Sequence, residues 1–508
     1  MIERRDLVVP MAAGLAYAAL GLVWLRFVYL SDFFQMIWLA DAQRAGIGSA
    51  WANGFLGFGY PALLNLVTIA TGNILTSGKL VQIVSGVTLL LMLPWATRRL
   101  FGDHKGAHLA QALLAVETIF VFAAAGETPD LLATALMFPG LVLAVDAGER
   151  DSSRSAVTAG VLLGLAYLVR YHALLLVCAL IVTLLLTRGA RRSVLWLVVG
   201  FVAASLPQMA LSGLIQGAPL FNLHIKSIAI GYYGTTSDFV QYTEPWTLWT
   251  IVSTAPVAVA KQYLVHVDRH FTAIGGTVFG LAGLLLARRN EGRPVVLVGA
   301  PLALLVLGLA MKFYTDRAIL LPLVVWYLVV GRAFAVAAAE PSAARAVAVT
   351  LLSGAIAFSS VLETGRRVSR VRGLQQVNDA VTRTLRARGV ADSREVFSTH
   401  LSYYLADDPH GGAFHPHDTW LLYDSSYARA FPHASFTDIP SLTAFVERED
   451  IRFLLLGPLT GELAPSVLAA QRSGSLGPDY ELLGRWPDLY LFEYVPARSR
   501  PGRVQGVR

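Results

Sequence analysis

An acidic side chain at the end of a hydrophobic run is the first candidate for chemistry in this sequence. The segment LSDFFQMIWLADAQRAG places Asp32 directly after apolar residues, at the lip of a membrane helix, where a carboxylate can still reach water. Such a carboxylate either caps or borders the helix that follows, or it acts on a bound ligand. The stretch SAWANGFLGFGYPALL comes next, with aromatic residues, glycines and a Tyr60-Pro helix start. A segment that only connects two spans does not need so many aromatic residues and glycines. We therefore expect this segment to bind a substrate, with Tyr60 among the contacts.

Two further acids, Glu127 and Asp130, lie in the short segment AGETPD. Two carboxylates beside a helix start are consistent with a favourable interaction with the helix dipole. They are equally suited to bind substrate hydroxyl groups or a metal ion. Both alternatives stay open, and Glu127 and Asp130 are candidate substrate contacts.

Cationic side chains lie at two further helix junctions. The sequence MKFYTDRAILLP contains Lys312 and Arg317, and LVRYHALL contains Arg170. Because most basic residues lie in loops on the opposite side of the membrane, these three indicate a local anion. That anion is either a lipid headgroup or a specific phosphate, so the three are candidates for phosphate binding.

The segment LIQGAPLFNLHIKSIAIGYYGTTSDF supplies the remaining candidates for substrate contact, Asn222, His224 and Lys226. His224 has no histidine or cysteine nearby at the spacing of metal ligands. The sequence HPH at 415–417 is better explained by a turn, and the single cysteine excludes a disulfide framework or a CxxC site. No residue is therefore predicted to be a metal ligand, and the chain contains no P-loop and no GxSxG motif.

The composition indicates what kind of scaffold must position these side chains. Of 508 residues, 55% are hydrophobic and only 15% are charged, and the mean hydropathy is +0.55. Several apolar runs approach the ~20 residues needed to cross a bilayer. We therefore predict a polytopic α-helical protein of the cell (inner or plasma) membrane. The net charge of +7 indicates membrane lipid rather than nucleic acid as a partner, because the basic residues lie in short loops between apolar runs.

About eleven transmembrane helices are predicted, with the N-terminus in the cytoplasm and the C-terminal part outside. This orientation keeps most arginines of the short loops inside. It also requires that 60–77 and 246–260 are helices lying on the outer surface. Residues 155–187 must form a hairpin, because a single helix of ~50 Å exceeds the ~30 Å core. The predicted spans are 7–29, 79–97, 107–125, 129–146, 155–169, 172–187, 194–214, 272–288, 294–311, 317–336 and 344–361.

The composition changes after the last span. Residues 1–362 are predicted to form the transmembrane domain, 363–496 a small extracytoplasmic α/β domain, and 497–508 a disordered tail. A basic amphipathic helix follows the last span, and IPSLTAFVERED predicts a further helix. Short strands are predicted in REVFSTH, TWLLYD, IRFLLLG and YELLGRWPDLYLFEYV, the last with a WPD turn between two strands.

The order of these motifs resembles that of GT-C superfamily membrane glycosyltransferases, the relatives of protein O-mannosyltransferases and aminoarabinose transferases. The resemblance covers about residues 1–335 well and the C-terminal part loosely. It rests on Asp32 after the first span and on the motifs GYPALL, TRRLFG, GETPDLLATAL, AGVLLGLAYLVRYHALLL and FYTDRAILLPL.

The resemblance implies horizontal helices on the outer face and transfer of a sugar from a polyprenyl-phosphate-linked donor to a hydroxyl of a glycan, lipid or protein. Asp32 matches the family's catalytic acid and would be the general base. Arg317 matches the arginine that faces the donor phosphate, and both side chains would flank one cavity, with inversion at the anomeric carbon. Phe33 stands where many relatives have a second acid, which argues against protein mannosyl transfer and against a metal held by an acidic pair. No cofactor is certain, and a divalent cation stays open.

Two other functions stay open on sequence grounds. A transporter or flippase of a lipid-linked precursor would place ionisable residues near the middle of the membrane, where Glu117 and Arg26 are the main candidates. A membrane-anchored binding protein would instead use the C-terminal residues 365–497.

Overall fold

The computed structural model is mostly helical and divides into two compact units. The first consists of Met1–Tyr29, Leu39–Tyr232 and Trp246–Val371, and the second of Leu30–Trp38, Tyr233–Pro245 and Arg372–Arg508. The structure describes residues 4–25, 28, 30–52, 57–185, 191–220, 253, 256–257, 319–339, 343–390, 395–398, 438–448, 450–456, 465–486 and 489–496.

The first unit is a bundle of long apolar helices, and the predicted polytopic helical fold is confirmed. Among the described residues, six helices are long and apolar enough to cross a membrane, or seven if the bent pair α5–α6 is one span. The predicted spans 272–288 and 294–311 lie outside the described residues, as does Arg26 and most of 246–260. The helices are α1 (Arg4–Ala18) with its π-helical continuation η1 (Ala19–Trp24), α4 (Ile74–Phe101), α5 (Ala107–Val116), α6 (Thr118–Ala125), α7 (Asp130–Arg150), α8 (Ser153–Val169), α9 (Ala173–Leu185), α10 (Arg191–Gln216), α15 (Leu320–Ala339) and α16 (Ala343–Ala387).

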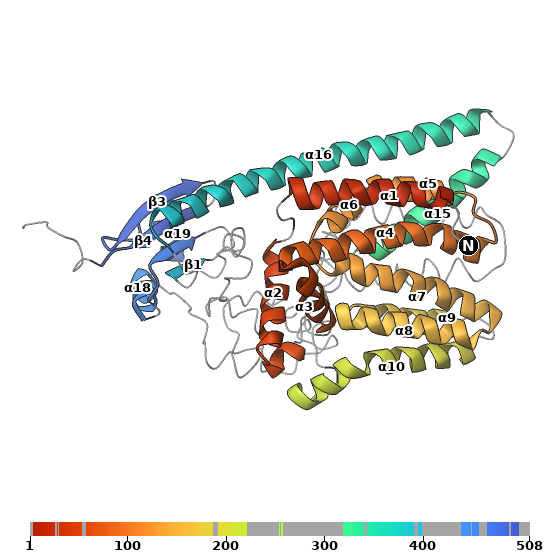
Figure 1. Ribbon diagram of the computed structural model, residues 1–508, viewed down its shortest axis with the longest axis horizontal. Helices are drawn as coiled ribbons and strands as arrows, with labels where there is room; N and C mark the ends of the chain where they lie inside the picture. The colour runs from red at the N-terminus through yellow and green to blue at the C-terminus, as the bar shows by residue number, and fades with distance from the viewer. Residues whose placement is uncertain are drawn as a thin grey trace, which may run out of the picture. The chain divides into compact units, whose positions relative to one another are not determined.

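Contacts between α1 and α4 show that these two helices run in opposite directions. Arg98, near the end of α4, faces Asp6 at the start of α1. Lys79, near the start of α4, donates to the carbonyl of Leu25, just beyond η1. Figure 1 shows α1, α4, α7, α8 and α10 running between these two ends of the bundle. We refer to them as the arginine end, with Arg98, Arg99 and Arg150, and the tyrosine end, with Tyr60, Glu127, Asp130 and Arg170.

Helix α3 (Gly59–Thr71) lies across the tyrosine end rather than along the bundle (Figure 1). Near its start, Tyr60 donates a hydrogen bond to the carbonyl oxygen of Glu127. Near its end, the hydroxyl of Thr68 lies 3.0 Å from that of Ser77, at the start of α4. Both parts of α3 therefore contact the same end of the bundle. The helix predicted over 60–77 ends at Thr71, and 74–77 belong to α4.

Helix α4 is longer than the predicted span 79–97 because local caps set its ends. The side chain of Asn73 accepts a hydrogen bond from the Thr76 N–H at 2.9 Å, which starts the helix at Ile74. Gly102 has a left-handed φ of 82°, and the helix ends just before it. The polar caps, rather than the apolar run, decide where the helix begins and ends.

The predicted span 107–125 is broken at Glu117, where α5 and α6 meet with a bend of 70°. Glu117 has an extended backbone, and its carboxylate accepts a hydrogen bond from the Phe120 N–H at 2.9 Å. This is a helix N-cap in the middle of an apolar run. The acid on which the transporter alternative rested therefore has a capping function at a helix break.

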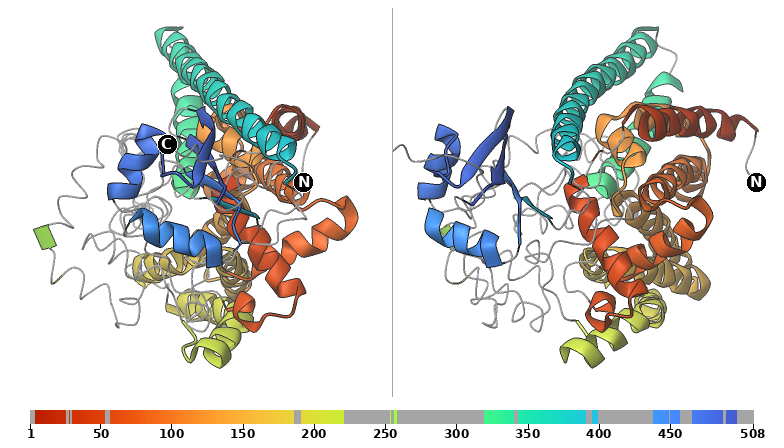
Figure 2. Two further views of the ribbon diagram at one scale, coloured as in Figure 1. Left: turned by 90° about the vertical axis from the view of Figure 1, so that its left-hand side faces the viewer. Right: turned by 60° about the vertical axis from the view of Figure 1, so that its left-hand side comes forward.

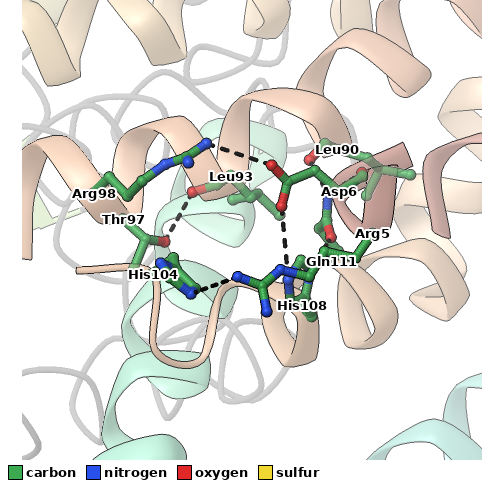
Figure 3. A network of polar contacts seen from close by, with 9 residues as sticks. All are labelled: Arg5, Asp6, Leu90, Leu93, Thr97, Arg98, His104, His108 and Gln111. Atoms are coloured by element: carbon green, nitrogen blue, oxygen red, sulfur yellow. Dashed lines mark hydrogen bonds and ion pairs between the residues drawn. The ribbon is translucent and has the colours of Figure 1, made fainter. Parts of the chain in front are cut away.

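A network of polar side chains connects α1, α4 and α5 at the arginine end (Figure 3). The carboxylate of Asp6, a residue only 3% exposed, lies 3.4 Å from Arg98 on α4 and 3.6 Å from Nε2 of His108 on α5. Gln111 donates to the carbonyl oxygens of Asp6 at 3.2 Å and Leu90 at 2.9 Å. These contacts fix α1, α4 and α5 against one another at this end of the bundle.

The second unit contains a four-stranded sheet in the order β1-β2-β4-β3. Strand β1 is parallel to β2, whereas β4 is antiparallel to both β2 and β3. Leu454 and Leu456 pack in one hydrophobic cluster with α18, and Phe453 and Leu455 pack in another with the end of α16, so both faces of β2 are covered. Figure 2 shows β3 and β4 in dark blue. The bounds are β1 Val396–Ser398, β2 Phe453–Leu456, β3 Tyr480–Trp486, β4 Leu489–Tyr494, α18 Ile439–Arg448 and α19 Pro465–Ser473.

The C-terminal elements follow the predicted pattern with two differences. Strands lie within REVFSTH, IRFLLLG and the terminal hairpin, whereas TWLLYD lies outside the described residues. Helix α19 was not predicted, and the last span and the amphipathic helix after it form the single helix α16. The predicted domain boundary between 362 and 363 therefore falls inside a continuous helix, and the domain bounds stay a prediction.

Candidate functional site

Four of the predicted site residues lie together at the tyrosine end of the bundle: Tyr60, Glu127, Asp130 and Arg170. Asp32 lies in the first turn of α2 (Leu30–Arg44). The structure describes the backbone of Asp32 but not its side chain. The remaining predicted residues, Lys312, Arg317, Asn222, His224 and Lys226, lie outside the described residues. Their predicted roles, like that of Asp32, stay predictions.

Arg170 and Asp130 form an ion pair between the end of α8 and the start of α7. The guanidinium Nη2 lies 2.9 Å from one carboxylate oxygen of Asp130 and 3.0 Å from the other. The side chains are 17% and 9% exposed, so both charges are largely removed from water. Because an unpaired charge would be costly here, each residue holds the other in place.

Tyr60 is fully buried, with no exposed surface. Its hydroxyl donates to the carbonyl of Glu127 and accepts from Nε2 of Gln82 at 3.3 Å, while the Gln82 carbonyl oxygen accepts from the Leu132 N–H at 3.2 Å. Burial raises the pKa of Tyr60 well above its ordinary value, so the phenol stays neutral and can donate. Gln82 was missed in the sequence, where its signal is a lone amide within the apolar run of α4.

The carboxylate of Glu127 reaches the chain that leaves the first helix. Its two oxygens lie 3.0 and 3.2 Å from the backbone N–H of Val28, and the residue is fully buried. Lys79, only 3% exposed, donates from Nζ to the carbonyl oxygens of Gly21 at 2.5 Å and Leu25 at 2.6 Å. The sequence analysis did not single out Lys79, although a lysine at the start of an apolar helix was the available signal.

His172 follows Arg170 at the turn between α8 and α9. Burial, together with the positive charge of Arg170, lowers the pKa of His172 from 6.5 to about 4. The imidazole is therefore neutral at physiological pH, and it adds no positive charge to this end of the bundle. Arg170 and Lys79 are the cations that the described part of the site contributes.

Residues 57–59, at the start of α3, contact α8 and α10. The N–H of Phe58 donates to the Gln208 side-chain oxygen at 3.1 Å. A Cβ atom at Gly59 would lie 2.9 Å from the carbonyl oxygen of Leu168, so the close approach to α8 requires a glycine there. The described residues 57–59 of this stretch therefore approach α8 most closely at glycines.

Among the described residues, no group of three or more histidine, cysteine, aspartate or glutamate side chains is arranged to hold a metal ion. The buried groups at the tyrosine end instead pair carboxylates with a guanidinium and with backbone N–H groups. This chemistry is suited to holding backbone segments in place.

Residues 57–209 match a protein family described as dolichyl-phosphate-mannose-protein mannosyltransferase. The matched region runs from α3 into α10 and contains Tyr60, Glu127, Asp130 and Arg170. No curated protein matches the chain.

Solved structures match over nearly the whole chain. Two crystal structures of ArnT from Cupriavidus metallidurans, one bound to undecaprenyl phosphate and one in the apo state, cover 97% of this chain and 99% of their own, with a TM-score of 0.58 and identities of 15% and 13%. The oligosaccharyltransferase of Archaeoglobus fulgidus, tethered with an acceptor peptide, matches with a TM-score of 0.50 and 13% identity, over 90% of this chain and 69% of its own. At these identities the likeness shows a shared fold.

Proposed function

This chain has the GT-C fold of membrane glycosyltransferases, and on that premise we propose that it transfers a sugar from a polyprenyl-phosphate-linked donor to an acceptor hydroxyl at the non-cytoplasmic face of the membrane. The observation that carries the proposal is the full-length likeness to ArnT, a protein that was crystallised with undecaprenyl phosphate. The family match over 57–209, which bears the name of a lipid-phosphate-dependent mannosyltransferase, supports the same class of donor. The identity of the sugar and of the acceptor is left to experiment.

The physical demands of such a donor agree with the groups at the tyrosine end. The prenyl chain stays in the bilayer and the phosphate stays at the interface, so the enzyme needs a cation at a helix end. Arg170 is such a cation, and its Nε–H is buried without a hydrogen-bond partner among the described residues. Although Asp130 occupies Nη2, an arginine has five N–H donors, so the same side chain can also contact a phosphate. We place Lys312 and Arg317 on the same phosphate.

In the proposed reaction, the Asp32 carboxylate takes the proton from the acceptor hydroxyl as its oxygen attacks the anomeric carbon. The bond between that carbon and the phosphate oxygen breaks, and polyprenyl phosphate leaves with both electrons of the bond. Arg317, with Lys312 and Arg170, offsets the charge that develops on the leaving phosphate. A single displacement of this kind inverts the anomeric configuration.

Replacing Asp32 with asparagine tests the catalytic part of the proposal. Membranes that contain wild-type or Asp32→Asn protein are incubated with several radiolabelled prenyl-phosphate sugars. The rate at which label is transferred from the lipid to an acceptor is measured. Because asparagine cannot accept the proton, we expect at least about a 100-fold loss of transfer. Asp41→Asn, on the same helix but paired with Arg44, is the matched control and should retain activity. Undiminished transfer by Asp32→Asn would remove Asp32 from the mechanism.

A further inference from the structure

Two amide side chains connect the end of α2, the segment after it and α3. Gln43 donates from Nε2 to the carbonyl oxygens of Ala50 and Phe58, at 3.3 Å each. Asn65, on α3, donates from Nδ2 to the carbonyl oxygen of Ala40 at 2.9 Å. All of these residues belong to the first unit. The nitrogen of each amide therefore holds a neighbouring part of the backbone.

The oxygens of the same two amides are buried and have no hydrogen-bond partner among the described residues. Gln43 is only 5% exposed, so bulk water does not supply the missing donor. Exchanging nitrogen and oxygen in either amide would not help, because an oxygen would then face a backbone carbonyl oxygen. Each amide therefore presents an acceptor without a donor.

A neighbouring amide shows that unmatched oxygens are not a general property of the tyrosine end. Gln208, on α10, has no exposed surface; its oxygen accepts from the Phe58 N–H and its Nε2 donates to the Ser212 hydroxyl, each at 3.1 Å. A buried acceptor without a donor destabilises the folded chain. Buried polar groups left in this way indicate a function for the group itself, so the oxygens of Gln43 and Asn65 point to a ligand that donates hydrogen bonds.

Two aromatic side chains lie next to the backbone groups that Gln43 holds. Trp51 directly follows Ala50, and Phe58 supplies the other carbonyl oxygen. The two ring centroids are 5.8 Å apart, the rings are tilted by 49°, and both residues are partly exposed. Ligand sites combine aromatic surface of this kind with a few polar groups that fix orientation. Aromatic rings cover the apolar C–H face of a sugar, while amide oxygens accept from its hydroxyl groups.

We propose that these four side chains form a subsite for the sugar of the donor, in which the oxygens of Gln43 and Asn65 accept hydrogen bonds from sugar hydroxyl groups. The phosphate that links the sugar to the prenyl chain carries no proton to donate, so these acceptors suit the sugar, whereas cations suit the phosphate. This inference rests on the proposed function and names the part of the substrate that this segment binds.

Donor analogues that each lack one hydroxyl group test the subsite. Full-length wild type, Gln43→Met and Asn65→Leu are assayed with undecaprenyl-phosphate-linked glucose, mannose and arabinose, and then with the deoxy analogues of the sugar that is transferred. Removing a hydroxyl that an amide oxygen binds should lower kcat/KM about 10-fold in wild type. The same removal should have little effect in the variant that lacks that oxygen, because both changes delete one contact.

Gln208→Leu is the matched control, because both ends of that amide already have partners within the protein. It should change kcat/KM by the same factor for the donor and for every deoxy analogue. If Gln43→Met and Asn65→Leu also act by one factor on all of these substrates, the subsite is overturned, and a general loss of stability in a variant does not affect this comparison.

Stabilisation by the ligand gives a readout that does not depend on transfer. In detergent, the donor should raise the unfolding temperature of wild type more than undecaprenyl phosphate alone does. This difference should shrink in Gln43→Met and Asn65→Leu and persist in Gln208→Leu. No difference in wild type, or an unchanged one in both amide variants, would overturn the subsite and leave water as the only donor. If wild type transfers no sugar while the difference depends on the amides, the proposed function fails and the subsite stands.

Discussion

At the scale of single residues, two buried carboxylates of the described bundle are each paired with an arginine. Arg170 faces Asp130 at the tyrosine end, and Arg99 faces Asp146 at 2.6 Å at the arginine end. Taking two charges out of water is costly, and their mutual attraction offsets that cost only while both are present. The loss of one partner is therefore far more damaging than the loss of both.

Substitution of Arg170 with alanine should destabilise the protein by about 3–5 kcal/mol, because Asp130 is left buried without its guanidinium. Replacing both residues, with Arg170→Met and Asp130→Leu, should recover much of that loss. Thermal unfolding in detergent measures both effects.

The control for this pair is an exposed one. Arg192 and Asp151 lie 3.7 Å apart with side chains 65% and 54% exposed, so Arg192→Ala should cost less than about 1 kcal/mol. Equal destabilisation by Arg170→Ala and Arg192→Ala would show that the buried pair contributes no more to stability than the exposed pair.

The sequence identified acids and cations at helix junctions better than it identified their partners. Glu127, Asp130 and Arg170 were selected because charged residues interrupt apolar runs, and the structure brings them together. Lys79 and Gln82 were not selected, because each is one polar residue within a long apolar helix, and their contacts come from distant parts of the chain. Such long-range partners cannot be read from local spacing.

At the scale of elements, α8 and α10 approach each other closely through glycines. A Cβ atom at Gly164 would lie 2.7 Å from both the Phe201 carbonyl oxygen and the Ala204 Cβ. Within a membrane, helices associate through such close packing, since lipid provides no hydrophobic driving force between them. The glycines are therefore part of the contact that holds α10 beside α8.

Alanine at Gly164 should destabilise the protein by about 1–3 kcal/mol, because the added methyl group forces the helices apart. At Gly213, also on α10 but with its nearest neighbour 3.6 Å from a Cβ atom, alanine fits and should stabilise by up to about 1 kcal/mol through helix propensity. The opposite signs are checked by unfolding temperatures in one detergent. A stabilising Gly164→Ala would contradict the close packing.

Hydrophobic runs predicted the helices themselves but not all their ends. The start of α4 depends on the Asn73 cap, and the break between α5 and α6 depends on Glu117 turning its carboxylate to a backbone N–H. An acid in an apolar run is equally compatible with an ion pathway and with a cap. Only the path of the backbone decides between them.

At the scale of the whole molecule, the two ends of the bundle differ in charge. Arg98, Arg99, Arg150 and Arg192 lie at or near the arginine end, which the positive-inside rule predicts to be cytoplasmic. Sequence alone predicted this sidedness from the distribution of basic residues, which also required that 60–77 not cross the membrane. The position of α3 agrees with that requirement, while the orientation in the cell stays a prediction.

Cysteine labelling tests the orientation, because Cys178 is the single cysteine and can be replaced by serine. In that background, Leu220→Cys, beyond the end of α10, should react with a membrane-impermeant maleimide in intact cells. Asp151→Cys, between α7 and α8, should react only after the cells are permeabilised. The reverse pattern would invert the predicted topology and would place the proposed site on the cytoplasmic face.

The π-helix at the end of the first span has a consequence for how this protein can change over generations. A π-turn holds one residue more than the same stretch of α-helix. Loss of a single codon within Ala19–Trp24 would allow ordinary i to i−4 bonding over the same stretch, so the residues downstream would keep their direction around the helix axis. In an ordinary α-helix the Gly21 carbonyl would bond within the helix instead of to Lys79, while the span would stay apolar and long enough for the bilayer, so hydropathy alone would not reveal the change.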